Sequence, residues 1–216
     1  MCFENERYDR NQCVTFRKTN EQPFGALSNM SDGYLLVVNG ERIKTSEALY
    51  QVCRFPRNSQ VQRLIIAEAS PMAAKMRSKP HRTECNRPDW DDVRVELMRW
   101  CLRVKLACNW VKFGRLLLAT GDRPIVEDSP KDRFWGAVAD KEEPAMLEGQ
   151  NVLGRLLMEL RDELRGPNRR ALMVVEPLPI ADFLLLDRPI ERITVSEDAW
   201  QRGEAVFARM LGERAA

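Results

Sequence analysis

The sequence has 216 residues, of which 44% are apolar and 31% are charged, and its net charge is +2 at pH 7. This length is typical of one domain of ordinary size, and the apolar share is large enough to fill its core. The longest uncharged apolar stretches, such as Leu116 to Ala119, have only four or five residues, which excludes a membrane span. The charged N-terminus, Met1 to Arg7, lacks the apolar segment of a signal peptide, so we expect a cytoplasmic protein.

Cysteine and histidine usage argues against several kinds of site. The six cysteines form no Cys-x-x-Cys pair, which argues against zinc and favours small core residues in a reducing compartment. They are Cys2, Cys13, Cys53, Cys85, Cys101 and Cys108. His81 is the only histidine, so it would have to be the base of any Ser-His-Asp or Cys-His arrangement. It lies in a loop-like stretch without a local partner, and we expect it at the surface.

The charge is unevenly distributed along the chain. Residues 1–72 carry +1, residues 73–115 carry +6 and residues 116–216 carry −5. The basic middle segment suits contact with phosphate groups, and it equally suits a solvated helix face rich in arginine. Charge alone leaves both interpretations open.

The first part of the chain is predicted to form short strands and turns, followed by helices. Val14 to Arg17 and Tyr34 to Val38 read as extended, and Asn39-Gly40 after the second is a β-hairpin signal. Ser46 is expected to cap one helix, and Ser70-Pro71 to begin another, because serine accepts an orphan amide and proline needs none.

The longest helix is predicted from near Asp89 to Asn109, with Lys105 on the margin of its apolar stripe. That stripe contains Val93, Leu97, Trp100, Cys101, Val104 and Cys108. Further helices are expected around residues 113–118, from Ser129-Pro130, and over Asn151 to Arg165. Residues 143–151 read as a loop.

The pattern changes beyond Gly166-Pro167. Ala171 to Val175 and Ile190 to Val195 read as extended, and Ser196 is expected to start a last helix. We therefore predict an α+β fold: a predominantly helical domain over residues 1–166 with a small N-terminal β portion. Residues 167–216 would form a C-terminal α/β appendage packed on it.

Glu47 and Trp90 occupy positions that suit either a functional or a structural role. Glu47 would lie at the first position of a helix, where free amides and the helix dipole stabilise a carboxylate. A plain helix-capping acid is the alternative. Trp90 follows Arg87 at the start of the long helix, and it is either a platform for stacking a base or a staple that fixes the helix start.

Several short motifs follow one another in an order that is specific, although each motif alone is weak. They are Pro23-Phe24-Gly25, Leu27-Ser28-Asn29, Thr45-Ser46-Glu47, Tyr50-Gln51, Ser70-Pro71, Asp89-Trp90, Lys105, Glu127, Asp132-x-x-Trp135-Gly136, and Gly149-x-Asn151-x-Leu153-Gly154 with Leu156-Leu157-Met158. The set resembles the NADAR (YbiA-like) family over residues 13 to 166. This resemblance implies an α+β fold dominated by helices and N-glycosidase activity on ribosylated nitrogen heterocycles.

The family contains two activities. Some members hydrolyse phosphorylated ribosylaminopyrimidine intermediates of riboflavin biosynthesis. Others remove ADP-ribose from guanine bases in nucleic acid and so oppose DarT-type ADP-ribosyltransferase toxins. The segments Glu47 to Gln51, Arg87 to Asp91 and Met98 to Lys105 are similar to the toxin-linked members, whereas riboflavin-type members have a histidine and an aromatic residue where this chain has Ala48-Leu49. The resemblance thus implies ADP-ribosylated nucleic acid as substrate, ADP-ribose as product and a cognate DarT-type toxin as a candidate partner.

This chemistry assigns roles to three charged side chains. Cleavage of a C1′–N bond develops positive charge on the ribose, which a nearby carboxylate stabilises, and Glu47 is the first choice. Asp132 is the candidate for moving a proton, unless it caps its own turn and leaves Glu47 to act alone. Lys105 either extends outward to a phosphate or solvent, or, if desolvated, acts as a nucleophile that captures C1′ as an imine.

Binding of the base is assigned to aromatic and amide groups. Trp90 and Trp135, the latter beside Gly136, are expected to sandwich the base. Stacking does not distinguish guanine from a pyrimidine, so hydrogen bonds must do so, and Asn29 and the amides around Gly25 are candidate donors.

Binding of the phosphates is assigned to two further places. The turn from Gly149 to Asn151 precedes a helix, where outward amides would make a pyrophosphate cradle. Arg87 would add a forked contact. This chemistry requires no metal or redox cofactor. A non-catalytic ADP-ribose-binding module is the alternative from another functional class, and the presence of both Glu47 and Asp132 argues against it.

Overall fold

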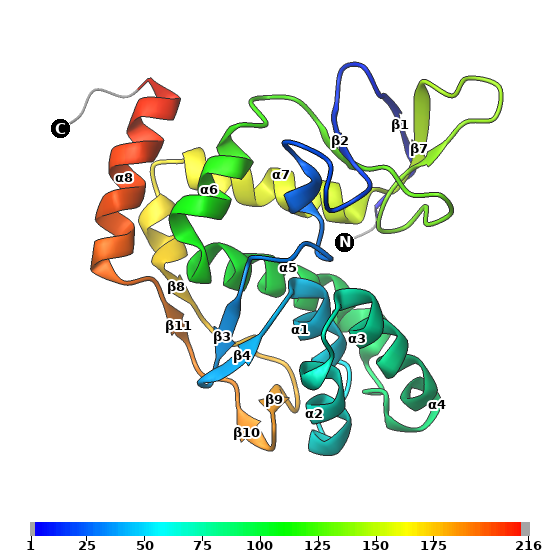
Figure 1. Cartoon of the computed structure of the whole chain (residues 1–216), viewed down its shortest axis with the longest axis vertical. Helices are drawn as coiled ribbons and strands as arrows, with labels where there is room; N and C mark the ends of the chain where they lie inside the picture. Colours follow the sequence, from blue (N-terminus) through cyan, green and yellow to red (C-terminus); the bar gives the residue numbers. More distant parts are fainter. Residues whose placement is uncertain (1–2, 213–216) are drawn as a thin grey trace.

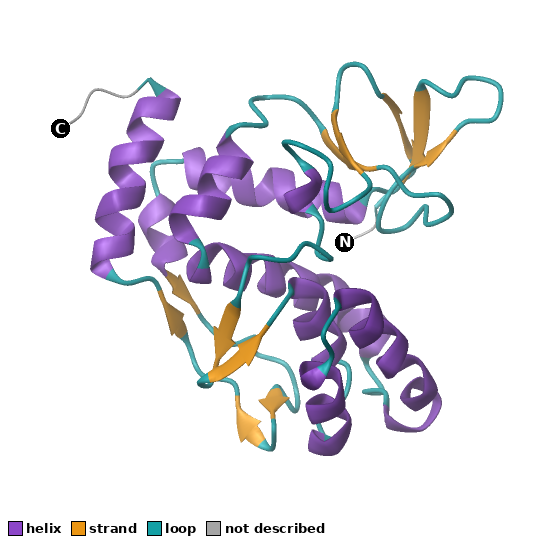
Figure 2. Ribbon diagram, in the orientation of Figure 1, coloured by secondary structure: helices purple, strands orange, loops and turns teal. Residues whose placement is uncertain are grey.

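A long helix, α5 (Trp90–Cys108), runs through the centre of the fold and packs against α1, α6 and α7. The computed structural model describes residues 3–212, and its elements are labelled in Figure 1. Helices dominate and the strands are short, as Figure 2 shows. The predicted α+β class with a helical majority is therefore confirmed.

The remaining elements are as follows. The other helices are α1 (Ser46–Val52), α2 (Ser59–Ala67), α3 (Pro71–Ser78), α4 (Arg82–Cys85), α6 (Trp110–Leu118), α7 (Val152–Arg165) and α8 (Glu197–Leu211), with 3₁₀ turns η1 (Gly25–Leu27), η2 (Lys79–His81) and η3 (Arg169–Met173). The strands are β1 (Glu6–Asp9), β2 (Val14–Phe16), β3 (Leu36–Val38), β4 (Glu41–Ile43), β5 (Ile125–Glu127), β6 (Val138–Ala139), β7 (Met146–Gly149), β8 (Val174–Val175), β9 (Leu184–Leu185), β10 (Arg188–Pro189) and β11 (Ile193–Thr194).

These strands make several small sheets. The largest one described has the order β1-β7-β6 and is antiparallel throughout. β2 pairs in parallel with β5, which links the N-terminal segment to the chain more than a hundred residues later. The other pairs are β3 with β4, β9 with β10, and β8 with β11, all antiparallel. Since none of these sheets is wide, the helices supply most of the core.

The predicted hairpin and helix starts are mostly confirmed. Asn39 and Gly40 have φ values of 51° and 82° and close the β3–β4 hairpin, since both positions of this turn require positive φ. The cap of α1 is Thr45, one residue before the expected Ser46, and its side-chain oxygen accepts from the amide of Ala48. Ser70 caps α3 as expected.

The stripe of α5 differs from expectation at its margin. Leu97, Trp100, Cys101 and Val104 are buried as predicted. Lys105, for which an outward and a desolvated position were both considered, is only 1% exposed and therefore desolvated. The reason is tertiary: the loop that contains η1 covers this face of α5 and supplies acceptors for the lysine.

Other local predictions are wrong. Ser129-Pro130 does not start a helix, because the Ser129 hydroxyl accepts from the amide of Asp132 and the chain then turns back. Residues 146–149, read as a loop, form β7 once they pair with β1. The prediction also missed α2 and β1. The strands β1 and β7 have four residues each, which is too short for their pattern to be recognised without the partner strand.

The C-terminal segment packs along the main body of the chain. α8 lies against α6, where Trp110 and Trp200 have ring centroids 5.5 Å apart. Gln62 in α2 donates to the carbonyl of Leu184 at 3.0 Å and accepts from the amide of Leu186 at 2.6 Å. Among residues 3–212, no helix has the length and hydropathy needed to cross a bilayer. Cys2 lies outside the described residues, and the other five cysteines are free thiols.

Candidate active site

One face of α1 presents the side chains that begin the site. Glu47, Tyr50 and Gln51 follow one another at helical spacing, so they point to the same side. Glu47 is only 6% exposed. Its Oε1 accepts from Gln51 Nε2 at 2.9 Å, and its backbone amide donates to the carbonyl of Asn29 at 3.1 Å. Because α1 begins at Ser46, Glu47 occupies the second helical position and still lies in the first turn.

The helices α3 and α4 form the wall opposite this face. Lys75 Nζ lies 3.7 Å from Glu47 Oε1. Gln51 Oε1 accepts from Ser78 Oγ at 2.8 Å and from Arg82 Nη2 at 3.2 Å. The polar groups of α1 are therefore held in place by a network from α3 and α4, which fixes the Glu47 carboxylate.

A second carboxylate reaches the site from the end of β5. Burial, together with the smaller effects of the negative charges of Asp132 and Glu47, raises the pKa of Glu127 from 4.5 to about 7, and Lys75 opposes this shift. Glu127, Glu47 and Asp132 therefore form one electrostatically linked group, here called the carboxylate cluster. A carboxyl group that is about half protonated at neutral pH beside a second carboxylate has the properties of an acid–base pair.

Asn151 positions Glu127. Its Oδ1 accepts from the amide of Glu127 at 3.1 Å, and its Nδ2 donates to the carbonyl of Ile125 at 2.8 Å. Gly154, one turn into α7, makes room for this clamp, because a Cβ there would lie 2.5 Å from both side-chain polar atoms of Asn151. Asn151 therefore acts on the site through the backbone of β5.

Asp132 caps its own turn, one of the two roles considered for it. Its Oδ1 accepts from the amides of Phe134 and Trp135 at 3.0 and 2.9 Å. This contact holds Trp135 at the edge of the site. The negative charge of Asp132 also acts on Glu127, so the residue contributes to both the shape and the electrostatics of the cluster.

The two tryptophans do not form an open sandwich. Tyr50 contacts both of them, with ring centroids 5.0 Å from Trp90 and 5.7 Å from Trp135. The guanidinium of Arg54 lies 3.8 Å from the centroid of the Trp90 ring, which is only 6% exposed. Trp90 is thus packed as a wall of the site, and the expected sandwich is corrected. Trp135 remains partly exposed and available to a planar group.

The loop around η1 places Asn29 next to Glu47. Asn29 is buried, its Nδ2 lies 2.7 Å from Met98 Sδ, and its Oδ1 has no hydrogen-bond partner among residues 3–212. A buried amide oxygen without a partner is costly, and a substrate donor would satisfy it. Gly25 has a packing function, because a Cβ there would lie 2.5 Å from the carbonyl oxygen of Lys18.

Lys105 supports the same loop from behind. Its Nζ donates to the carbonyls of Ala26 at 2.8 Å and Ser28 at 3.1 Å, and it lies near the rings of Tyr34 and Phe113. Burial, with a smaller effect of Lys112, lowers the pKa of Lys105 to about 7. The lowered pKa agrees with the expected desolvation. The enclosed position does not suit a phosphate ligand, and it gives Lys105 a positioning role in this structure.

The expected pyrophosphate cradle has no free amides. At the start of α7, the amides of Asn151, Val152 and Leu153 donate to the carbonyls of Gly136, Phe134 and Trp135 at 3.0–3.1 Å. Gly149 and Gly136 allow this close packing, since a Cβ on Gly149 would collide with the Gly136 carbonyl oxygen. These residues build the backbone that positions Trp135 and Glu127, and the assignment of phosphate binding to them is corrected.

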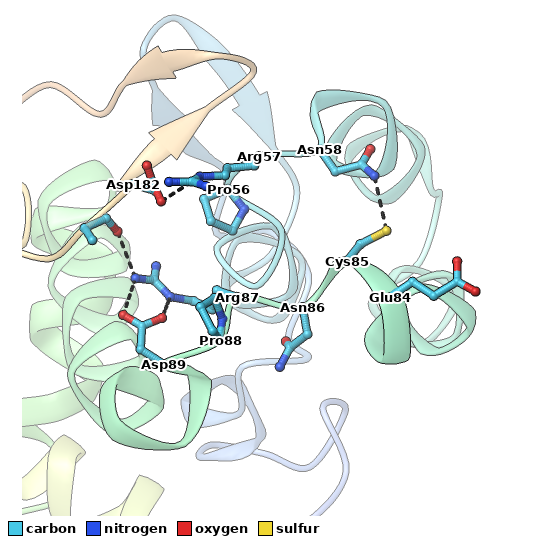
Figure 3. Close-up of a pocket in the computed structure, with 11 residues that line it drawn as sticks. Pro56, Arg57, Asn58, Glu84, Cys85, Asn86, Arg87, Pro88, Asp89 and Asp182 are labelled. Atoms are coloured by element: carbon cyan, nitrogen blue, oxygen red, sulfur yellow. Dashed lines mark hydrogen bonds and ion pairs between the residues drawn. The ribbon is translucent and has the colours of Figure 1, made fainter.

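Arg87 is also engaged within the protein. It forms a forked pair with Asp89, at 2.6 and 2.9 Å, and donates to the carbonyl of Ala181 at 2.9 Å. Figure 3 shows it in a cavity of about 550 Å³, beside the ion pair of Arg57 and Asp182. No member of the carboxylate cluster lines this cavity. The predicted forked contact is therefore made with Asp89 instead of a phosphate.

Several residues of the site escaped the sequence analysis. Glu127 was part of a motif without an assigned role, and Lys75, Arg82 and Arg54 were not assigned at all. The seven-residue spacing from Glu47 to Arg54 was only a weak signal, because it repeats one helix face but α1 ends two residues before Arg54. Lys75 and Arg82 had no such signal, since only the packing of α3 and α4 on α1 brings them close. Among the described residues, no group of three or more His, Cys, Asp or Glu side chains is arranged to hold a metal ion.

Glu127 makes the stability of the fold depend on pH. Its folded-state pKa of about 7 lies above the ordinary 4.5, so the native state binds the proton more tightly than the unfolded state. The stabilisation is complete below about pH 4.5 and is lost as the pH rises through about 7. We expect wild-type protein to lose more stability between about pH 5 and about pH 8 than Glu127→Gln, as measured by urea unfolding. An identical pH dependence in both proteins would contradict this assignment.

Comparison with known proteins gives several relatives of substantial identity. An N-glycosidase of Nostoc punctiforme is 34% identical over 147 residues, covering 67% of this chain and 88% of that protein. The N-glycosidase YbiA of Escherichia coli K12 is 34% identical over 155 residues, covering 70% of this chain and 88% of YbiA. A riboflavin biosynthesis protein of Vibrio vulnificus is 33% identical over 165 residues, and the matched region spans 42% of its length.

The solved structure of E. coli YbiA has a similar fold. It superposes with a TM-score of 0.58 at 31% identity, covering 73% of this chain and 90% of the YbiA chain. The NADAR domain model matches residues 15–165, which include every member of the carboxylate cluster. The chain therefore belongs to the NADAR domain family.

Proposed function

We propose that this protein is an N-glycosidase that removes ADP-ribose from guanine bases of nucleic acid. The observation that supports the glycosidase reaction best is the electrostatic coupling of Glu127 to Glu47, with a raised pKa that keeps part of Glu127 protonated at neutral pH. Two carboxyl groups with different protonation states are what cleavage of a glycosidic bond needs. The named N-glycosidases among the relatives support the same reaction class.

The reaction divides between the two carboxyl groups. The C1′–N bond breaks with its electron pair leaving on the base nitrogen, and the Glu47 carboxylate stabilises the positive charge that develops on the ribose. Glu127 donates its proton to the departing base. Water then adds through oxygen to C1′ and returns a proton to Glu127, so ADP-ribose and the free base in the strand are the products. General acid–base assistance of this kind contributes about 10²- to 10⁴-fold in rate.

Other residues orient the substrate. Trp135 provides a partly exposed ring for the base, and stacking on such a ring contributes roughly 1–3 kcal/mol. The unpartnered Oδ1 of Asn29 accepts from a base N–H. Lys105 and Asn151 keep the loop with Asn29 and the end of β5 in position. No step of this reaction requires a metal or a redox cofactor.

The choice of nucleic acid rests on the motifs after Glu47 and on charge. α3 and η2, which flank Glu47, carry Lys75, Arg77 and Lys79 on partly or fully exposed positions. Basic side chains on a surface beside the site favour a polyanionic substrate. A strand bearing ADP-ribose on guanine fits this charge, and the product of a DarT-type toxin would be such a strand.

Relatives named for riboflavin biosynthesis favour a second candidate function. In that case the same carboxylates would hydrolyse a ribosylaminopyrimidine phosphate. Both reactions break a ribosyl C1′–N bond, so the substrate alone distinguishes them.

One assay tests the proposal. The protein is incubated with a single-stranded oligonucleotide carrying ADP-ribosylated guanine and, separately, with a ribosylaminopyrimidine 5-phosphate. We expect release of ADP-ribose from the oligonucleotide and no action on the pyrimidine. Release of ribose 5-phosphate alone would establish the second candidate. Tight binding of ADP-ribose with no turnover of either substrate would instead identify a non-catalytic module.

A further inference from the structure

Arg54 is a partly buried cation that has no ion-pair partner among residues 3–212. Its side chain makes no hydrogen bond and no ion pair with any residue in 3–212, and its Nε is buried without a partner. The guanidinium is held flat over Trp90, with its centre 3.8 Å from the ring centroid. A partly buried guanidinium loses hydration that the ring alone does not replace, so its N–H groups remain available for an acceptor.

Two further arginines surround Arg54. Burial and the neighbouring charges of Arg82 and Arg94 lower the pKa of Arg54 to about 10, while Tyr50 and Asp91 act in the opposite direction. Arg82 donates to the neutral groups of Gln51 and Ser78. Arg94 lies 3.9 Å over the Phe134 ring, and its nearest ion-pair partner is the exposed Asp91 at 3.7 Å.

The balance of charge on this side of the site is therefore positive. One exposed carboxylate, Asp91, acts on Arg54 and Arg94, and Glu47, which acts on Arg82, is paired with Lys75. Three guanidinium groups on one side of the site carry a charge that Asp91 and Glu47 offset only in part, and an anion bound among them would offset it further. A phosphate suits this position, because each guanidinium presents forked donors that match its oxygen atoms.

We propose that Arg54, Arg82 and Arg94 form a phosphate subsite that binds the 5′-phosphoryl group of the ribose whose C1′ faces Glu47. The subsite rests on the proposed glycosidase function, and it replaces the phosphate contacts expected of Arg87 and of the α7 start. Arg54 follows Glu47 by seven residues and lies just beyond the end of α1 at Val52, and seven residues of helical rise correspond to roughly 10 Å. A ribose 5-phosphate and one arginine side chain together bridge such a separation.

Two ligands would bring this group to the subsite. The 5′-oxygen of ADP-ribose carries a pyrophosphate, and that of a ribosylaminopyrimidine phosphate carries a monophosphate. Ribose 5-phosphate and ADP-ribose are therefore both titrated as probes, with unphosphorylated ribose as the reference. Tighter binding of ADP-ribose than of ribose 5-phosphate would assign the pyrophosphate, and equal binding would assign the monophosphate; either result requires the subsite.

The test compares Arg54→Gln with wild-type protein by calorimetric titration. A lost charge-assisted hydrogen-bond pair corresponds to about a 10- to 100-fold loss of affinity for ribose 5-phosphate and ADP-ribose, with ribose unchanged. Arg57→Gln is the matched control, because Arg57 is three residues away and its side chain is 80% exposed beside Asp182. Arg57→Gln should bind all three probes as wild type does.

A second variant keeps the subsite testable if Arg54→Gln fails to fold. Arg82→Gln should lose affinity for the two phosphorylated probes as Arg54→Gln does, and thermal unfolding of each variant shows whether the fold persists. Unchanged binding of ribose 5-phosphate and ADP-ribose by folded Arg54→Gln would overturn the subsite, even if the wild type hydrolyses its substrate. Arg54-dependent binding in a wild-type protein that hydrolyses neither substrate would reject the glycosidase proposal and retain the subsite.

Discussion

Replacement of Glu47 by glutamine is expected to lower kcat by about 10²- to 10⁴-fold, while KM changes little. The amide has the same shape, and its oxygen still accepts from Gln51, so the network around α1 persists. Only the negative charge is lost, and that charge is needed when the ribose becomes positive in the transition state. Steady-state kinetics on the ADP-ribosylated oligonucleotide measures the effect.

The control for this substitution is Glu84→Gln. Glu84 is exposed on α4 and lies outside the carboxylate cluster, so its replacement should leave kcat unchanged. Thermal unfolding should show the Glu47→Gln fold to be intact. If folded Glu47→Gln retained wild-type kcat, Glu47 would not stabilise the transition state.

Replacement of Asn151 by alanine is expected to destabilise the fold by roughly 3 kcal/mol and also to lower kcat. The side chain is fully buried, and its loss leaves the Glu127 amide and the Ile125 carbonyl without partners, at about 1–3 kcal/mol each. The left-handed backbone at Asn151, with φ of 49°, adds strain for alanine. Urea unfolding measures the loss of stability. The decrease in kcat measures the effect on catalysis of losing the hydrogen bond that positions Glu127.

Two comparisons separate the causes of this effect. Asn151→Gly relieves the backbone strain and still lacks the hydrogen bonds, so it should retain the kcat defect. Asn168→Ala changes an exposed asparagine and should alter stability by less than about 0.5 kcal/mol. Should Asn151→Ala resemble Asn168→Ala in both measurements, the clamp would have no role in positioning Glu127.

The site is assembled from segments far apart in the sequence. α1 supplies Glu47, the turn after α1 supplies Arg54, α3 supplies Lys75, and the end of β5 supplies Glu127. The N-terminal segment orders β5 through the parallel β2–β5 pairing, and α7 orders it through Asn151. A change in any of these supports is therefore expected to alter the cluster without touching the substrate.

Local sequence determined several features of this protein by itself. Asn39-Gly40 fixed the hairpin, Ser70-Pro71 fixed the start of α3, and the apolar spacing fixed α5, because each of these depends on neighbours within one turn. The ordered motifs also indicated the family and singled out Glu47.

Tertiary structure decided the roles of the polar residues. The sequence predicted a phosphate contact for Arg87 and left Lys105 open between a phosphate contact and a desolvated nucleophile, and folding enclosed both with acceptors from distant loops. No sequence pattern assigned a role to Arg54. In the fold it lies near Arg82 and Arg94, and no residue among 3–212 provides a hydrogen-bond acceptor for its side chain. Whether a charged side chain binds a ligand or another part of its own chain depends on which distant groups reach it. The spacing of residues along the sequence does not predict those tertiary contacts.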